Sequence, residues 1–244
     1  MHPSSPGQAA ESGLQAVLFD FDGTTADCFE DIARAVNHAL VTLGRPELPL
    51  PAVVKLVGNG ARELVRRALG PAHEHLTDHA LKLMGRHYLE HPADHARLYP
   101  GIESMLEALR AQGICTALVT NKPHAVALLV ASHLKLDTLM DNVVGEQESL
   151  ARKPAPDMLL EACRRLEVTP ARCVMVGDGP MDIEAARRAG MPCVAVLWGM
   201  CTEQELAACQ PAALARNAAE LPQLAHAALA GAAAIPVRQP YVTE

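Results

Sequence analysis

Short apolar runs alternate with segments of helical spacing over most of the chain. The runs are typical of buried strands and span residues 17–19, 114–120, 142–145, 173–178 and 192–198. Helical segments lie between them at residues 101–113, 123–135, 156–167 and 181–190. Strands that alternate with helices in this way pair in parallel, and the helices cover both faces of the sheet. The pattern therefore predicts an α/β fold with a three-layer, Rossmann-like parallel sheet as its core.

One long stretch interrupts the alternation. Residues 29–44 place Ile32, Val36 and Leu40 on one helical face, and helical spacing returns at the end of 53–70 and over 78–91. No strand-like run separates these segments, so they predict an inserted, all-helical cap domain. The predicted boundaries are a flexible N-terminus at 1–14, a core at 15–27 and 98–235, a helical cap at 28–97 and a C-terminal tail at 236–244.

Composition narrows the class of partner. The chain has 244 residues, a formal net charge of −7 and no basic run, which disfavours nucleic acid as a partner. No stretch approaches the roughly 20 apolar residues of a membrane span, and the first residues lack the apolar segment of a signal peptide. Seven cysteines without a CxxC spacing favour reduced thiols. We expect a cytoplasmic protein, monomer or homodimer, that binds neither nucleic acid nor a membrane.

Polar side chains gather where the apolar runs end. Asp20 and Asp22 follow the first run, and Thr120 and Asn121 end the second. Asp178 and Asp182 lie at the end of the run at 173–178 and just after it. Lys153 precedes the predicted helix at 156–167. Parallel sheets bind ligands outside the carboxyl ends of their strands. The sequence therefore predicts a single site on this edge of the sheet.

Phosphoryl transfer is the chemistry that needs this set of side chains. A carboxylate such as Asp20 can attack phosphorus and form an aspartyl-phosphate, which splits one difficult step into two. Mg²⁺ prefers carboxylate oxygens and relieves the repulsion between that carboxylate and the phosphate, so Asp20 and Asp178 are candidate ligands. Lys153 and the Thr120 hydroxyl offer a charge and a donor to the phosphate oxygens. Asp22 is placed to exchange a proton with the leaving oxygen.

Four motifs, in chain order, resemble those of the haloacid dehalogenase-like hydrolase superfamily. They are DFDGT at 20–24, VTNK at 119–122, the lysine of KPAPD at 153–157 and GDGPMD at 177–182. The resemblance implies a phosphatase in which Asp20 is the nucleophile and Asp22 the general acid and base. It also implies a Mg²⁺ site made by Asp20, Asp178 and the Asp22 carbonyl with Asp182 as further acidic support, and phosphate contacts from Thr120 and Lys153.

The predicted helical insert resembles the cap of this superfamily's first cap class. Within it, LVGNGARELVRRAL at 56–69 is similar to the corresponding loop of phosphoglycolate phosphatases. Backbone N–H groups at the start of a helix suit a small carboxylate. The predicted substrate contacts are Gly58, Asn59, Gly60 and Arg62 from this loop, with Gly23, Thr24 and Asn121 from the core.

The resemblance thus implies hydrolysis of a small phosphate monoester, with phosphoglycolate as the first candidate. Sugar phosphates, nucleotides and phosphorylated biosynthetic intermediates are alternative substrates on the same core. A phosphosugar mutase of the β-phosphoglucomutase type is the nearest alternative reaction. It would return the phosphoryl group to the substrate instead of to water.

Several of these residues also have a plainer interpretation. Asn121 and Asp182 are candidate N-caps of the helices that follow them. Arg62 lies on a helix whose other side is apolar, which favours a solvated position. Trp198 and Gly199, after the last run, are expected to pack in a loop. Two histidine pairs have the i, i+4 spacing of a zinc site but lack a nearby acidic or cysteine ligand: His75 with His79, and His87 with His91.

Two other classes of protein fit parts of the pattern. A response-regulator receiver also carries acidic residues, a threonine and a lysine on a parallel sheet, but it is far shorter and has no insert. A catalytically silent binding protein could share the scaffold, but every catalytic position is filled in this chain.

Overall fold

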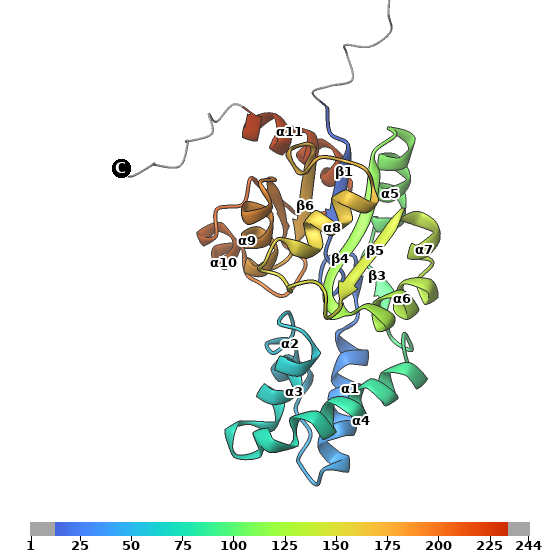
Figure 1. The fold of residues 1–244 in the computed structure, drawn as a ribbon, viewed down its shortest axis with the longest axis vertical. Coiled ribbons are helices and arrows are strands. Elements are labelled where there is room, and N and C mark those ends of the chain that lie inside the picture. Colours follow the sequence, from blue (N-terminus) through green and yellow to red (C-terminus); the bar gives the residue numbers. More distant parts are fainter. Residues whose placement is uncertain (1–12, 234–244) are drawn as a thin grey trace, which may run out of the picture.

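A six-stranded sheet forms the centre of the protein, as the computed structural model shows for residues 13–233 (Figure 1). The predicted tail at 236–244 and most of the predicted N-terminal segment lie outside the described residues. All strand pairs in this sheet are parallel, in the order β5-β4-β1-β6-β7-β8. The strands are β1 (Ala16–Phe19), β4 (Cys115–Pro123), β5 (Asn142–Glu146), β6 (Cys173–Gly177), β7 (Cys193–Val196) and β8 (Ala213–Ala215).

Helices cover both faces of the sheet, which confirms the predicted three-layer core. They are α5 (Ile102–Ala111), α6 (His124–His133), α7 (Leu136–Leu139), α8 (Asp157–Arg165), α9 (Pro180–Ala189), α10 (Glu203–Ala208) and α11 (Leu221–Ala233). The central strand β1 is buried on both sides, which explains its continuous apolar sequence. Its Phe19 packs in one apolar cluster with residues of α5 and α11, while Leu18 packs in a second cluster with residues of α8 and α9.

The insert between β2 and β3 contains only helices. They are α1 (Phe29–Thr42), α2 (Leu50–Val54), α3 (Ala61–Leu69) and α4 (Thr77–Glu90), with a 3₁₀ turn at Pro71–Leu76. A short antiparallel pair, β2 (Ala26–Asp27) with β3 (Arg97–Leu98), brings the two connecting segments together. Figure 1 shows these helices beyond one end of the sheet. This is the arrangement expected of a cap, although the exact domain boundaries stay a prediction.

Amphipathic spacing explains how the insert holds together. In α3, Leu64 and Val65 are buried, whereas Arg66 and Arg67 lie on the other side and both pair with Glu63. The buried side of each helix joins one apolar cluster that continues into the core around Phe21. The insert is therefore packed onto the sheet region and does not stand apart from it.

Several short or weakly patterned elements were not predicted, among them β8, α2 and α11. The strand β8 has only three residues, which is too short for a period to appear. The helix α2 has only five residues and begins beside two prolines, Pro49 and Pro51. The helix α11 falls in an alanine-rich tract whose apolar spacing has no clear period.

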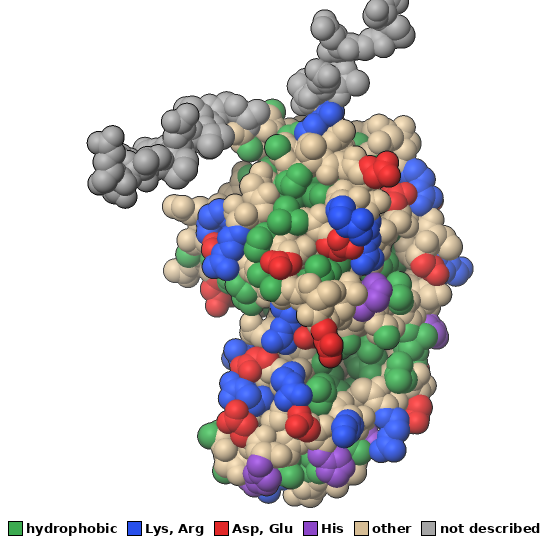
Figure 2. Space-filling view, viewed as in Figure 1, with side chains coloured by type: hydrophobic (Ala, Val, Ile, Leu, Met, Phe, Trp, Pro, Cys, Tyr) green, Lys and Arg blue, Asp and Glu red, His purple; other side chains and the backbone are tan. Residues whose placement is uncertain are grey.

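The helices that the structure describes are not suited to a bilayer. Among residues 13–233, none of the helices is both long and apolar enough to span a membrane. On the face shown in Figure 2, Lys and Arg side chains are interspersed with Asp and Glu over both the insert and the core. All seven cysteines are unbonded thiols in the structure.

Candidate active site

The four motifs meet at the carboxyl ends of four neighbouring strands, β5, β4, β1 and β6. Because β1 lies between β4 and β6, residues that follow these strands are brought to one place. The Asp20 N–H donates to the Val176 carbonyl of β6 at 2.9 Å, which fixes the start of the turn after β1. The register of β4 against β5 shifts between Val119 and Pro123, so the end of β4 is irregular where it carries Thr120, Asn121 and Lys122.

Three carboxylates form the centre of the site. Asp20, Asp178 and Asp182 each place one carboxylate oxygen within 4.8 Å of the others. Burial, followed by repulsion from Asp20 and Asp182, raises the pKa of Asp178 to about 8. Burial also raises the pKa of Asp20 to about 7, against the opposing effect of Lys153. Such a group of carboxylate oxygens could hold a divalent cation, and a cation would offset its repulsion.

Asp178 is held in place by a hydroxyl and a backbone N–H. The Thr24 hydroxyl donates to Asp178 Oδ1 at 3.1 Å, and the Met200 N–H donates to Oδ2 at 2.8 Å. Gly23 has φ +89°, and a Cβ there would come within 2.3 Å of Asp178 Oδ2. Thus the structure uses Thr24, a predicted substrate contact, to orient a carboxylate.

Gly199 is a site residue that the sequence analysis treated as loop packing. A Cβ on Gly199 would lie 2.2 Å from the Asp178 Cβ, so a larger residue would displace that carboxylate. Neighbouring Trp198 donates from Nε1 to the Thr24 carbonyl at 3.0 Å. Neither contact has a local sequence signal, because Gly199 lies 21 residues from Asp178 and Trp198 lies 174 residues from Thr24.

Lys153 joins two of the three acids. Its Nζ lies 2.7 Å from Asp20 Oδ1, 2.7 Å from Asp182 Oδ1 and 2.8 Å from the Val119 carbonyl oxygen. Burial by itself would lower the pKa of Lys153, but Asp182 and Asp20 outweigh it, so the pKa is raised and the ammonium stays charged. The other oxygen of Asp182 accepts the Gly179 N–H at 3.1 Å, so Asp182 serves the start of α9 from its third position and not as its N-cap.

Asn121 links the lysine loop to the insert. Its side-chain amide exchanges two hydrogen bonds of 2.9 Å with the backbone of Lys153 and donates to the Gly58 carbonyl at 2.9 Å. The interpretation of Asn121 as an N-cap is wrong, because α6 begins after Pro123 without a side-chain cap. Both donors of the amide and its oxygen thus have hydrogen-bond partners, at Gly58 and Lys153, that are distant in the sequence.

Asp22 pairs with a lysine to which the sequence analysis gave no role. The Lys122 ammonium lies 2.7 Å and 2.9 Å from the two Asp22 oxygens, and both side chains are largely buried. Burial alone would lower the pKa of Lys122, but Asp22 outweighs it and the pKa is raised. The Lys122 N–H donates to the Thr120 hydroxyl oxygen at 3.1 Å. Its place in the VTNK motif was the available signal for Lys122.

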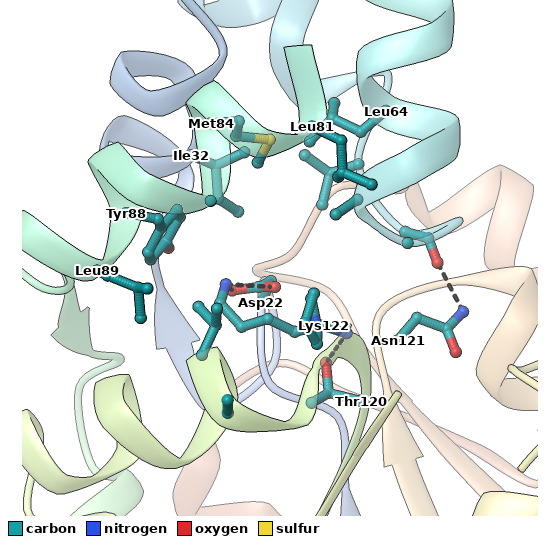
Figure 3. Close-up of a pocket in the computed structure, with 18 of the residues that line it drawn as sticks. Asp22, Ile32, Leu64, Leu81, Met84, Tyr88, Leu89, Thr120, Asn121 and Lys122 are labelled. Carbon is teal, nitrogen blue, oxygen red and sulfur yellow. Dashed lines mark hydrogen bonds and ion pairs between the residues drawn. The ribbon is translucent and has the colours of Figure 1, made fainter. Parts of the chain in front are cut away.

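A cavity of about 320 Å³ separates these groups from the insert (Figure 3). Its polar residues come from the core: Asp20, Asp22, Thr120, Asn121 and Lys122. The insert contributes mainly apolar side chains, namely Ile32, Val57, Leu64, Leu81, Met84, Tyr88 and Leu89, with Gly58, Gly60, Ala61 and Gly85. The cavity thus has one polar side and one apolar side.

The predicted substrate loop reaches this cavity only in part. Gly58 and Gly60 line it, but Asn59 does not, and the Asn59 carbonyl accepts a hydrogen bond from Arg152 at 3.3 Å. Arg62 lies outside and pairs with Asp78 at 2.7 Å, with both side chains more than half exposed. The solvated interpretation of Arg62 agrees with this geometry.

Comparison with known proteins identifies the family. The haloacid dehalogenase-like hydrolase family matches residues 17–196, well over half of the chain. This protein belongs to that family. The match begins within β1 and ends with β7, so it includes all four motifs and the insert.

Individual relatives of this haloacid dehalogenase-like hydrolase are named for one substrate. The chain is 40% identical over 188 residues to the plasmid phosphoglycolate phosphatase of Cupriavidus necator, covering 75% of this chain and 81% of the relative. It is 34% identical to the phosphoglycolate phosphatase of Psychrobacter arcticus, covering 81% and 89%. The crystal structure of a predicted phosphoglycolate phosphatase from Haemophilus somnus superposes with a TM-score of 0.79 and 28% identity, covering 86% and 97%.

The histidine pairs of this family member do not make a metal site. Among the described residues, the Asp20 trio is the only group of three or more histidine, cysteine or acidic side chains that could share an ion. The His87 ring stacks on the His38 ring with centroids 4.5 Å apart, and His91 pairs with Asp94 at 2.9 Å. The first contact joins α1 to α4, and neither contact involves a residue that lines the cavity.

Proposed function

We propose that this protein is a Mg²⁺-dependent phosphatase that hydrolyses 2-phosphoglycolate through a phosphorylated Asp20. The observation that carries the proposal is the trio of carboxylates, two buried and one partly buried, with Lys153 at the polar side of the cavity. The broader class is plain from the family and its named relatives: the protein is a phosphoric monoester hydrolase.

A divalent cation fits the trio. The trio has one lysine, Lys153, which contacts Asp20 and Asp182. Burial, followed by repulsion between the acids, raises the pKa of Asp178, and burial together with repulsion from Asp182 raises that of Asp20 in spite of Lys153. Asp20, Asp178 and the Asp22 carbonyl are the expected ligands. Asp182 already accepts from Lys153 and from the Gly179 N–H, which favours a supporting role for it. When bound, Mg²⁺ supplies the positive charge that lets a carboxylate approach a phosphate.

The residues of the chain divide the remaining work. Asp20 attacks phosphorus, and the 2.7 Å contact with Lys153 favours the ionised form of its carboxylate and aligns it. Thr120 and Lys153 receive the phosphate oxygens. Asp22 gives a proton to the leaving oxygen and later takes one from water, and its contact with Lys122 fixes its carboxylate over the cavity.

The relatives and the cavity support phosphoglycolate as the substrate. The relatives are named for phosphoglycolate, and a volume of about 320 Å³ holds a small ester. Sugar phosphates are less well supported, because their hydroxyl groups would lose water against the apolar side without gaining partners. The same argument counts against a phosphosugar mutase.

Phosphate release and trapping of the intermediate test the proposal. The purified protein with Mg²⁺ is expected to release phosphate from 2-phosphoglycolate and from p-nitrophenyl phosphate, and to lose both activities in EDTA. Rapid acid quench followed by peptide mass spectrometry is expected to place a phosphoryl group on Asp20. Phosphorylation of another residue, or conversion of a hexose 1-phosphate to an isomer without release of phosphate, would contradict it.

A further inference from the structure

One buried polar atom in the cavity has no partner. Among residues 13–233, the Tyr88 hydroxyl is the only buried side-chain nitrogen or oxygen without a hydrogen bond. Tyr88 belongs to α4 of the insert, is only 3% exposed and lines the cavity. A buried hydroxyl without a partner is costly, so its retention at this place indicates a partner that arrives with a ligand.

The ammonium group of Lys122 lies beside the aromatic ring of Tyr88. The Lys122 ammonium is 5.0 Å from the centre of the Tyr88 ring, and Tyr88 projects from α4 toward the Lys122–Asp22 pair (Figure 3). An ammonium has three donors, and the two contacts with Asp22 leave one, which lies near the Tyr88 hydroxyl oxygen and is available to an acceptor on a ligand. Tyr88 and Lys122 therefore present two donors to the same part of the cavity from opposite sides.

The other insert side chains that line the cavity carry no charge. Apolar side chains form the remainder of that side, and Arg62 is turned to the surface. The start of α3, at Gly60 and Ala61, is the other polar place, through its backbone N–H groups. A second anionic group on a substrate could therefore bind at the start of α3 or beside Tyr88. Only the position beside Tyr88 combines a full positive charge, on Lys122, with an unpaired O–H donor.

We propose that Tyr88 and Lys122 form the subsite that binds the carboxylate of the substrate's organic part, and that Tyr88 determines specificity for carboxylated phosphate esters. The proposal rests on the phosphatase function proposed above. One carboxylate oxygen accepts the Tyr88 O–H, and the carboxylate also accepts the remaining N–H of Lys122. An ester without that carboxylate leaves the Tyr88 hydroxyl unpaired, which is the condition under which polar sites discriminate strongly.

The substitution Tyr88→Phe removes this hydroxyl and little else. For 2-phosphoglycolate we expect KM to rise about 10- to 100-fold, the effect of one hydrogen bond to a charged group, with a much smaller change in kcat. Ethyl phosphate has the same two-carbon skeleton in its leaving group but lacks the carboxylate, and its kcat/KM is expected to fall far less. The matched control is Tyr99→Phe, since Tyr99 does not line the cavity, and it should affect both esters alike.

Stability separates this role from a structural one. Because Tyr88→Phe removes an unpaired buried hydroxyl, the melting temperature is expected to stay level or rise. Equal losses on both esters, or a fall in melting temperature that accounts for the loss, would overturn the assignment of Tyr88. So would a wild-type enzyme that does not prefer 2-phosphoglycolate to ethyl phosphate. In either case the phosphatase proposal would stand, whereas a protein that released phosphate from neither ester would fail that earlier proposal.

Discussion

The two sides of the cavity are built on different principles. On the core side, every acid that surrounds the reaction centre has partners within the fold: Lys153 for Asp20 and Asp182, Thr24 and Met200 for Asp178, and Lys122 for Asp22. On the insert side, the surface is apolar and its one buried hydroxyl, on Tyr88, has no partner among the described residues.

The difference separates chemistry from selection. Groups that are held by several partners keep their geometry when a ligand arrives, which is what transfer of a phosphoryl group requires. A wall with few polar groups contributes shape and a small number of specific contacts. Changes on the core side should therefore affect all esters, whereas changes on the insert side should affect some esters more than others.

The largest effect is expected from Asp20→Asn. An amide cannot form the aspartyl-phosphate, so kcat should fall about 1,000-fold or more on every ester. Initial rates with p-nitrophenyl phosphate and with 2-phosphoglycolate measure this. Asp137→Asn, at an exposed position of α7, is the matched control and should keep the wild-type rate. Turnover above about one per cent of wild type would contradict the role of Asp20 as nucleophile.

Lys153→Met tests whether the stability of the core side of the cavity depends on the Lys153 ammonium. Its loss leaves Asp20 and Asp182 buried without their shared cation, which typically costs about 3–5 kcal/mol in the free energy of unfolding. Urea unfolding compares it with Lys55→Met, whose side chain is exposed. A free energy of unfolding equal to that of the control would show that the fold does not depend on this cation.

Removal of metal should make stability depend on pH. The pKa values of Asp20 and Asp178, about 7 and 8, lie above the ordinary value of 3.8. The native state then binds more protons than the unfolded state, so in EDTA the free energy of unfolding should fall as pH rises from roughly 4 through 8. Added Mg²⁺ should restore stability most at the alkaline end, since it binds only the native state. Urea unfolding at pH 5.5, 7 and 8.5 measures this. If the free energy of unfolding in EDTA did not change with pH, the raised pKa values of Asp20 and Asp178 would be contradicted.

The smallest effect is expected from Arg62→Ala. Arg62 makes an exposed pair with Asp78, and such pairs contribute about 0–1 kcal/mol to stability. KM for 2-phosphoglycolate should change less than about twofold, in contrast to Tyr88→Phe. A tenfold rise in KM would mean that the insert moves and brings Arg62 to the substrate, and the division between the two sides would need revision.

Motif spacing predicted the core better than the insert. Asp20, Thr120 and Asp178 follow strands whose order in the sheet obeys a general rule, so their meeting could be foreseen. In the insert, GNGAR looked like a single substrate loop, but Gly58 and Gly60 line the cavity while Arg62 does not. A helical period states which residues share a face, but not toward what that face turns.

The sequence by itself determined the parallel sheet, the helical insert and the set of groups that carries phosphoryl transfer, because strand and helix periods and strand-end residues are local properties of the chain. Only the tertiary structure decided which partner each group has. The pairing of Lys122 with Asp22, the fit of Gly199 against Asp178 and the place of the Tyr88 hydroxyl beside Lys122 depend on residues more than 20 positions apart in the chain. Such contacts arise from packing, and packing leaves no period in the sequence.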